Sequence, residues 1–275
     1  MGFEMDVRDF LRYLWYDWFR QVGEALLIAF AVTTFVFTTV QVYGESMTPT
    51  LQNGERVLVP KYEMWLVRFG LRDWKRGEIV IVKPPAGAPN SVTSFPVIGF
   101  NFRPFFIKRV VAKPGDSVKI DRGRLIVNGY YVDESHITNK ITPFPDSFPR
   151  LLLADGKVVG FQGFRVDGLP DYLKDAFRML EPLPQELLET SRDHSLEVVG
   201  SLKLDPGFYF VMGDNRKLGG SEDSRVFGPV RTENIAGRAS MVWWPPVAKT
   251  DFGWKFNIRT LPIPSGYRQI PDPQN

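Results

Sequence analysis

The segment Tyr43-Gly44-Glu45-Ser46-Met47-Thr48-Pro49-Thr50-Leu51 begins where a long uncharged apolar run ends. Glycine near its start and proline near its end favour a turn, and this turn carries a single serine, Ser46. If the apolar run crosses a bilayer, the serine lies at the membrane surface. We predict that Ser46 is a nucleophile and that two later segments, residues 106–109 and 213–225, complete its site.

The apolar run before this turn covers residues 25–44 and contains no charged residue. At about 1.5 Å of rise per residue, about 20 helical residues reach the roughly 30 Å needed to cross a bilayer. A cleavable export signal is the competing interpretation, because Ala29-Phe30-Ala31 has the small-x-small pattern of a cleavage site. Glu24, however, leaves only a few apolar residues before that tripeptide. We therefore predict an uncleaved transmembrane anchor over residues 25–43.

The residues before the anchor, 1–24, have the pattern of an amphipathic helix. The pattern is rich in tryptophan and tyrosine, which suits a membrane interface, although packing on the protein's own core would produce it too. Basic residues before the span slightly outnumber those soon after it, which favours a cytoplasmic N-terminus. These residues are Arg8, Arg12 and Arg20 before the span, and Arg56 and Lys61 after it.

Composition excludes several kinds of site. The 275 residues, 44% of them hydrophobic, are enough for one large or two modest domains with a real core. The net charge of +3 comes with no long basic block, which argues against nucleic acid as the main partner and permits contact with anionic lipid. There is no cysteine, and the two histidines, His136 and His194, are far apart in the chain. We expect no metal site, no cofactor and no histidine-based catalytic triad.

Short runs rich in Val, Ile and Phe, separated by turns that contain Gly, Pro or Asn, predict a mainly β fold of twisted antiparallel sheets. The expected strands are residues 56–59, 78–82, 106–112, 117–120, 124–127, 207–212 and 237–243.

The distribution of these predicted strands divides the chain after the anchor into a β domain, an insert and a tail. We assign residues 44–129 and 206–259 to a catalytic β domain. Residues 130–205 are interrupted by prolines and contain short helical patterns, which indicates an insert or cap subdomain. Residues 260–275 are expected to form a mobile Pro-rich tail. The apolar segment 95–106 could line a core or rest on the membrane.

Amide hydrolysis needs a nucleophile, a base and donors for the oxyanion. A lysine can act as the base if burial keeps its amine uncharged. Lys108 lies in an apolar run that predicts a buried strand, and Arg109 beside it would point to the opposite face, where it could meet a carboxylate. Lowering a lysine pKa by about three units costs about 4 kcal/mol, so such a residue needs a packed pocket and a hydroxyl to orient it.

Taken together and in this order, the segments resemble type I signal peptidases, which are membrane-anchored Ser/Lys proteases that remove export signals. The matching segments are Gly44-Glu45-Ser46-Met47-x-Pro49-Thr50-Leu51, Phe106-Ile107-Lys108-Arg109-Val110-Val111-Ala112-x-Pro114-Gly115-Asp116, Gly213-Asp214-Asn215-Arg216 with Ser221-x-Asp223-Ser224-Arg225-x-x-Gly228, and a minor Arg76-Gly77-Glu78-Ile79-Val80. The resemblance covers about residues 20–130 and 205–245.

This resemblance implies a role for each matching position. Ser46 would be acylated, Lys108 would be the general base, and the Ser221 hydroxyl would orient the lysine amine. The Ser46 backbone N–H would be one oxyanion donor. Position 44, where some members of the family have a serine that supplies a second donor, is Gly44 here. The linker before Ser221 is also longer than usual. Structural ion pairs would join Arg109 to Asp214 and Arg225 to Asp223. The residues expected to shape the shallow pockets for small side chains are Val42, Met47, Leu51 and Ile107.

The resemblance further implies a bacterial plasma-membrane protein with a single span and its catalytic domain on the outer face. Its partners would be pre-protein signal peptides of the Ala-x-Ala type, the lipid bilayer and the export translocon. Two alternatives stay open at this point. One is a self-cleaving Ser/Lys regulator like the bacterial SOS repressors, and the other is a catalytically silent, membrane-tethered scaffold on the same fold.

Overall fold

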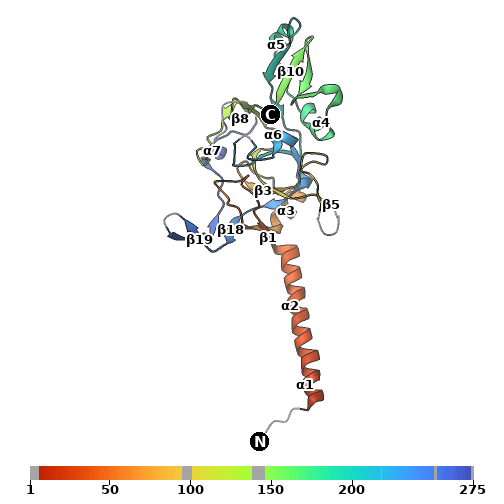
Figure 1. Ribbon diagram of the computed structural model, residues 1–275, viewed down its shortest axis with the longest axis vertical. Coiled ribbons are helices and arrows are strands. Elements are labelled where there is room, and N and C mark those ends of the chain that lie inside the picture. The colour runs from red at the N-terminus through yellow and green to blue at the C-terminus, as the bar shows by residue number, and fades with distance from the viewer. Residues whose placement is uncertain (1–5, 95–100, 138–145, 218, 251–252, 274–275) are drawn as a thin grey trace.

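The computed structural model describes residues 6–94, 101–137, 146–217, 219–250 and 253–273. A single long helix leads into a body of β-sheets, and a smaller subdomain lies at the end of the body farthest from that helix (Figure 1). The predicted fold class, antiparallel sheets behind one N-terminal apolar helix, is confirmed.

The N-terminal helix runs without interruption through α1 (Val7–Tyr13), the π-helical η1 (Leu14–Trp18), α2 (Phe19–Ala31) and η2 (Val32–Val36). Its part from Phe19 to Val36 is long and apolar enough to cross a membrane, and none of that part is buried by the rest of the protein. This apolar helical part, Phe19–Val36, overlaps the anchor predicted for residues 25–43 but is shifted toward the N-terminus, and the anchor itself stays a prediction. The β-branched run after Val36 forms strand β1 instead, because it finds a partner strand in the body.

The sheet next to the helix has the order β1-β2-β18-β21, and all its neighbours are antiparallel. Its strands are β1 (Phe37–Gln41), β2 (Arg56–Pro60), β18 (Met241–Trp244) and β21 (Arg259–Thr260). The connection from β1 to β2 contains Ser46. The anchor and the predicted nucleophile are thus linked by one short strand.

The central sheet has the order β16-β15-β6-β3-β17. Its strands are β16 (Val230–Arg231), β15 (Phe208–Met212), β6 (Phe106–Ala112), β3 (Ile79–Val82) and β17 (Ile235–Arg238). Strand β6, which carries Lys108, is the middle strand, and Lys108 lies opposite Val80 of β3. The single strand predicted over 237–243 is wrong, because β17 and β18 belong to different sheets and residues 239–240 separate them.

A third sheet, of order β14-β7-β8-β9, contains both ends of the segment predicted as an insert. Its strands are β14 (Leu202–Lys203), β7 (Ser117–Asp121), β8 (Arg124–Val127) and β9 (Tyr130–Tyr131). The turn from β8 to β9 uses Asn128 and Gly129, both at positive φ, as a tight hairpin requires. The framework therefore extends beyond the expected boundaries at 129 and 206.

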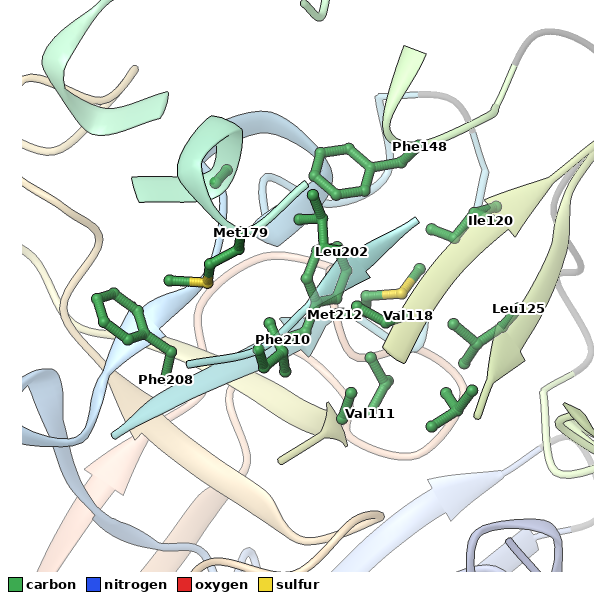
Figure 2. Packing of buried hydrophobic residues seen from close by; sticks show 14 of the residues in the cluster. Val111, Val118, Ile120, Leu125, Phe148, Met179, Leu202, Phe208, Phe210 and Met212 are labelled. Atoms are coloured by element: carbon green, nitrogen blue, oxygen red, sulfur yellow. The ribbon is translucent and has the colours of Figure 1, made fainter. Parts of the chain in front are cut away.

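The insert itself is a sheet of order β12-β11-β10-β13 with short helices beside it. Its elements are β10 (Arg150–Ala154), β11 (Lys157–Phe161), β12 (Phe164–Arg165), the 3-10 turn η3 (Val166–Gly168), α4 (Asp171–Arg178), α5 (Gln185–Thr190) and β13 (Leu196–Val199). Phe148 and Met179 pack into the same buried cluster as Phe210 and Met212 of β15 (Figure 2). Insert and framework therefore share one core.

The remaining elements lie around these sheets. They are α3 (Lys61–Arg68), β4 (Thr93–Ser94), β5 (Asn101–Phe102), α6 (Ser224–Phe227), η4 (Thr232–Asn234), the hairpin β19 (Val247–Thr250) and β20 (Gly253–Phe256), and α7 (Ser265–Arg268). Residues 95–100 of the apolar segment 95–106 lie outside the described residues.

The prediction of a mobile tail after residue 260 is wrong for the residues that the structure describes. Tyr267 and Ile270 are buried in the main hydrophobic cluster. The guanidinium of Arg76 donates to the Ile270 carbonyl oxygen at 2.9 Å while it is ion-paired with Asp116. The prolines suggested disorder, but the apolar side chains between them are held because they fill the edge of the core.

We expect Ile270→Ala to lower the free energy of unfolding by about 2 to 4 kcal/mol, because it removes buried methyl groups and leaves a cavity. Ile258→Ala is the matched control, since Ile258 is 38% exposed against 7% for Ile270, and should cost about 1 kcal/mol or less. Chemical denaturation of both variants measures the difference. Equal losses would contradict a packed tail.

Candidate active site

Ser46 lies in the loop between β1 and β2, and Lys108 lies on the central strand β6. The Lys108 Nζ and Ser46 Oγ atoms are 3.0 Å apart, within hydrogen-bond distance. The serine is partly exposed, whereas the lysine is 3% exposed. A reachable hydroxyl therefore contacts a buried amine, although 61 residues separate them in the sequence.

The environment of Lys108 favours its uncharged form. Burial, the dominant cause, lowers the pKa of the Lys108 amine from its ordinary value of 10.5 to about 8. The negative charge of Asp223 opposes this shift, and the positive charge of Arg225 supports it. A substantial fraction of the amine is therefore unprotonated slightly above neutral pH, as a general base requires.

The ion pair between Asp223 and Arg225 limits how far the Asp223 carboxylate raises the pKa of Lys108. Arg225 Nε and Nη2 both donate to the Asp223 carboxylate at 2.8 Å, and the backbone N–H of Gly213 donates to it at 2.9 Å. Burial alone would raise the pKa of Asp223, but these partners lower it to about 2. The expected pairing is present, and the arginine offsets a charge that would otherwise favour the ammonium form of Lys108.

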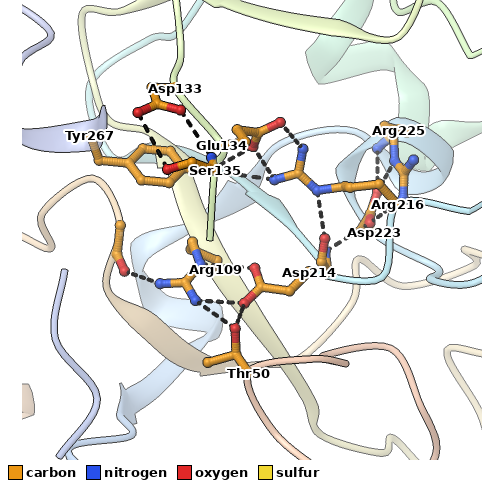
Figure 3. A network of polar contacts seen from close by, with 12 residues as sticks. Thr50, Arg109, Asp133, Glu134, Ser135, Asp214, Arg216, Asp223, Arg225 and Tyr267 are labelled. Atoms are coloured by element: carbon orange, nitrogen blue, oxygen red, sulfur yellow. Dashed lines mark hydrogen bonds and ion pairs between the residues drawn. The ribbon is translucent and has the colours of Figure 1, made fainter. Parts of the chain in front are cut away.

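Arg109 forms the second expected pair, on the opposite face of β6 (Figure 3). Its Nε donates to Asp214 Oδ1 at 2.8 Å, and its Nη1 donates to the Gly77 carbonyl oxygen at 2.6 Å. Thr50 also donates its hydroxyl to Asp214. Burial would raise the pKa of Asp214, but Arg109 and Thr50 hold it below its ordinary value. This network joins the serine loop, the lysine strand and the segment after β15.

The segment after β15 holds the nucleophile loop by its backbone. The N–H of Asn215 donates to the Ser46 carbonyl oxygen at 3.0 Å. A Cβ atom on Gly213 would lie 2.2 Å from Ser221 Oγ and 2.4 Å from the Ser46 carbonyl oxygen, far inside contact distance. Only glycine therefore allows Ser46, Ser221 and β15 to approach this closely.

The structure brings Ser221 to the site without the hydrogen bond that the resemblance implies. Ser221 is buried beside Gly213, but its Oγ has no hydrogen-bond partner within the described residues, Lys108 included. The hydroxyl instead lies against the Gly213 backbone. An orphaned buried hydroxyl is unusual and makes Ser221 available to another partner. Its role in orienting the lysine stays a prediction.

The two expected oxyanion donors are placed differently. The Ser46 N–H has no hydrogen-bond partner among the described residues, so it is free to bind an oxyanion. The N–H of Gly44, in contrast, donates to Asn53 Oδ1 at 3.0 Å. Gly44 has a φ of +79°, which suits glycine, and no side chain fills the space next to its Cα. With its N–H bonded to Asn53 and no side-chain hydroxyl, Gly44 offers no donor in this arrangement, and the source of a second oxyanion donor is not assigned.

The four residues expected to shape the substrate pockets meet in one place. Val42, Met47, Leu51 and Ile107 belong to a single buried cluster between the sheet next to the helix and the central sheet. All four side chains are buried, so they form part of the core beneath the Ser46 loop. That they form pockets for small side chains stays a prediction.

Sequence reasoning missed four further groups that hold the site. Thr50 donates to Asp214, and its place in the nucleophile segment, four residues after Ser46, was a usable signal. Asp146, a residue of the insert, pairs with Arg225 of the framework. Glu134 pairs with the fully buried Arg216 (Figure 3). The Tyr267 hydroxyl donates to Glu134 at 2.9 Å. No local pattern connects these distant segments. Among the described residues, no cluster of acidic or histidine side chains could hold a metal ion.

We expect Asp214→Asn to lower the free energy of unfolding by about 3 to 5 kcal/mol, because it leaves Arg109 buried without its counter-charge. Asp167→Asn is the control, since its ion pair with Arg165 is exposed to solvent and should contribute little to stability. Denaturant titration compares the two. Equal stability of the two variants would contradict a larger stabilising role for the buried pair of Arg109 and Asp214.

A buried neutral amine, a reachable hydroxyl and a free backbone N–H beside that hydroxyl are the components of acyl transfer by a Ser/Lys dyad. The arrangement agrees with what comparison with known proteins finds. The chain is similar to "Probable signal peptidase I-2" of Synechocystis sp., with 26% identity over 231 residues, which is 84% of this chain and 74% of that protein. It is also similar to "Signal peptidase IB" of Staphylococcus aureus, with 26% identity over 241 residues, 88% of this chain and 94% of that protein.

Among solved structures, a signal peptidase I from Enterococcus faecalis V583 is similar at 20% sequence identity and a TM-score of 0.28, over 61% of this chain and 97% of that chain. The sequence model described as signal peptidase, peptidase S26, matches residues 15–244. Because this match spans most of the chain, the protein belongs to the signal peptidase family, peptidase S26.

Proposed function

We propose that this protein is a membrane-bound serine endopeptidase that cleaves N-terminal signal peptides from exported pre-proteins, with Ser46 as nucleophile and Lys108 as general base. The observation that carries the proposal is the 3.0 Å contact between Ser46 Oγ and the buried Lys108 Nζ, whose pKa burial lowers to about 8. A silent scaffold has no need for a desolvated amine beside a reachable hydroxyl.

The chemistry follows from these atoms. Neutral Lys108 accepts the Ser46 proton while Ser46 Oγ attacks the carbonyl carbon of the scissile bond, and the Ser46 N–H donates to the developing oxyanion. Lys108 then gives the proton to the departing amine, which leaves an ester on Ser46. Neutral Lys108 then takes a proton from a water molecule whose oxygen attacks the ester carbonyl carbon. The ester C–O bond breaks, Ser46 Oγ receives that proton from Lys108, and the signal peptide departs with a new C-terminal carboxyl group.

The anchor supports membrane location on physical grounds. The helix from Phe19 to Val36 is exposed along its whole length, and exposed apolar surface of this extent favours lipid. The elements α3, β18 and the β19–β20 hairpin lie at the end of the body where this helix enters (Figure 1). They carry exposed aromatic side chains such as Phe69, Trp244 and Trp254.

Aromatic rings of this kind suit a membrane interface. We infer that the body rests on the membrane and that Ser46 faces the bilayer surface, where the substrate's own apolar helix would present its cleavage site. Confinement of enzyme and substrate to one plane would raise their effective concentration. The small excess of basic residues before the helix favours a cytoplasmic N-terminus and a catalytic domain on the outer face. Contact with the export translocon stays a prediction.

We expect Ser46→Ala to lower kcat for a precursor whose signal ends in Ala-x-Ala by about four orders of magnitude or more, because no acyl-enzyme can form. The assay uses purified full-length protein in detergent. Ser191→Ala is the matched control, since Ser191 is a buried serine in the insert whose hydroxyl bonds only locally, to Leu188. Wild-type cleavage by the Ser46→Ala protein would refute the assignment.

The pH profile tests the base. Because the amine accepts a proton only when it is neutral, we expect kcat/KM to rise about tenfold per pH unit below about pH 8 and to level off above it, as Lys108 loses its proton. Kinetics on the wild-type protein between about pH 6 and about pH 10 measure this. A profile that stays flat or falls through pH 8 would exclude Lys108 as the base.

A further inference from the structure

A hollow of about 200 Å³ opens between the framework and the insert directly beside Ser221. The framework contributes Ser221 and Arg225 to its lining, and the insert contributes Ser147, Arg150 and Gln162. The ion pair between Arg225 and Asp146 spans the same place and ties the two units together. The insert therefore forms one wall of the space next to the catalytic groups.

A neighbouring hollow lies on the insert sheet and shares one lining residue with the first. A second hollow, of about 570 Å³, is also lined by Arg150 and extends over Leu152, Phe164 and Glu197. Its floor is open because Gly160 has no side chain: a Cβ atom there would lie 2.9 Å from Leu152 Cβ. Arg150 thus lines both hollows. We call the pair of hollows the insert groove.

Among the residues that the structure describes, two buried polar atoms along the insert groove lack hydrogen-bond partners, and its residue Arg150 lacks an acidic partner. Ser221 Oγ and Gln162 Nε2 are both buried without a hydrogen-bond partner among the described residues. Arg150 is exposed and forms no ion pair within the described part of the chain; its Nε makes one long contact of 3.5 Å with Gln162 Oε1. Two hydrogen-bond donors and a free guanidinium suit a ligand that has carbonyl oxygens and a carboxylate.

The location of the insert groove relative to the anchor helix indicates which ligand it binds. The anchor helix and the insert lie at opposite ends of the molecule (Figure 1). The apolar cluster that contains Val42 and Met47 packs between the sheet next to the helix and the central sheet. If the proposed function holds, the signal peptide's apolar helix is in the bilayer. The chain that follows the cleaved bond then leads away from the membrane, toward the insert.

We propose that the insert groove binds the pre-protein residues that follow the cleaved bond, and that Arg150 makes this segment selective for an acidic side chain. The inference rests on the proposed function and adds a specificity site to it. Leu152 and Phe164 would contact apolar side chains farther along the segment, since both are about 40% exposed in the wider hollow.

The test uses matched precursors that differ only in having aspartate or lysine at one position after the cut, moved along successive positions. For each enzyme variant, the ratio of kcat/KM for the two precursors is measured, because a ratio does not depend on the fraction of folded enzyme. At one or more positions we expect the wild type to favour aspartate about two- to fivefold, as for an exposed ion pair. Arg150→Glu should reverse the preference at those positions.

Lys174→Glu is the matched control, since Lys174 is an exposed lysine on helix α4 of the same subdomain, pairs with Asp171 and lines neither hollow. Its ratios should equal those of the wild type. Identical ratios for the wild type and Arg150→Glu at every position would overturn the inference and leave the proposed function intact. Cleavage of these precursors by the Ser46→Ala protein would instead overturn the proposed function.

Discussion

The desolvation of one lysine amine beside one serine hydroxyl is the constraint on which the rest of this structure depends. Lowering the pKa of Lys108 from 10.5 to about 8 corresponds to about 3 kcal/mol of disfavoured charge. The folded protein has to supply this energy through packing elsewhere. The middle position of β6 in the five-stranded sheet meets this need, because strands on both sides and clusters on both faces exclude water from the lysine.

Burying an amine is useful only if nearby charges do not restore its proton. The carboxylates of Asp214 and Asp223 lie close enough to favour the ammonium form. Each is bound by an arginine, Arg109 for the first and Arg225 for the second, so its field at the lysine is offset. The same pairs fix the segment after β15 against the lysine strand. Electrostatic tuning and positioning are therefore done by the same side chains.

The parts of the chain that looked peripheral are structurally joined to the site. Tyr267 bonds to Glu134, and Glu134 pairs with Arg216, whose Nε donates to the carbonyl oxygen of Gly213 at 2.7 Å. The final segment thereby supports the glycine that lets Ser46 and Ser221 approach. The insert shares its core with β15 and forms one wall of the space beside Ser221. Neither is an independent appendage.

The sequence by itself determined the features that short-range patterns encode. Alternating apolar runs and turn residues predicted most strands of the framework, and three ordered motifs predicted which serine, lysine and ion pairs would meet. Only the tertiary structure decided where the anchor ends, because the residues after Val36 become a strand by pairing with β2. It also decided that Tyr267 is buried, that Asn53 occupies the N–H of Gly44, and that Ser221 is left unpaired. Each of these depends on contacts between residues apart in the chain, which no local pattern records.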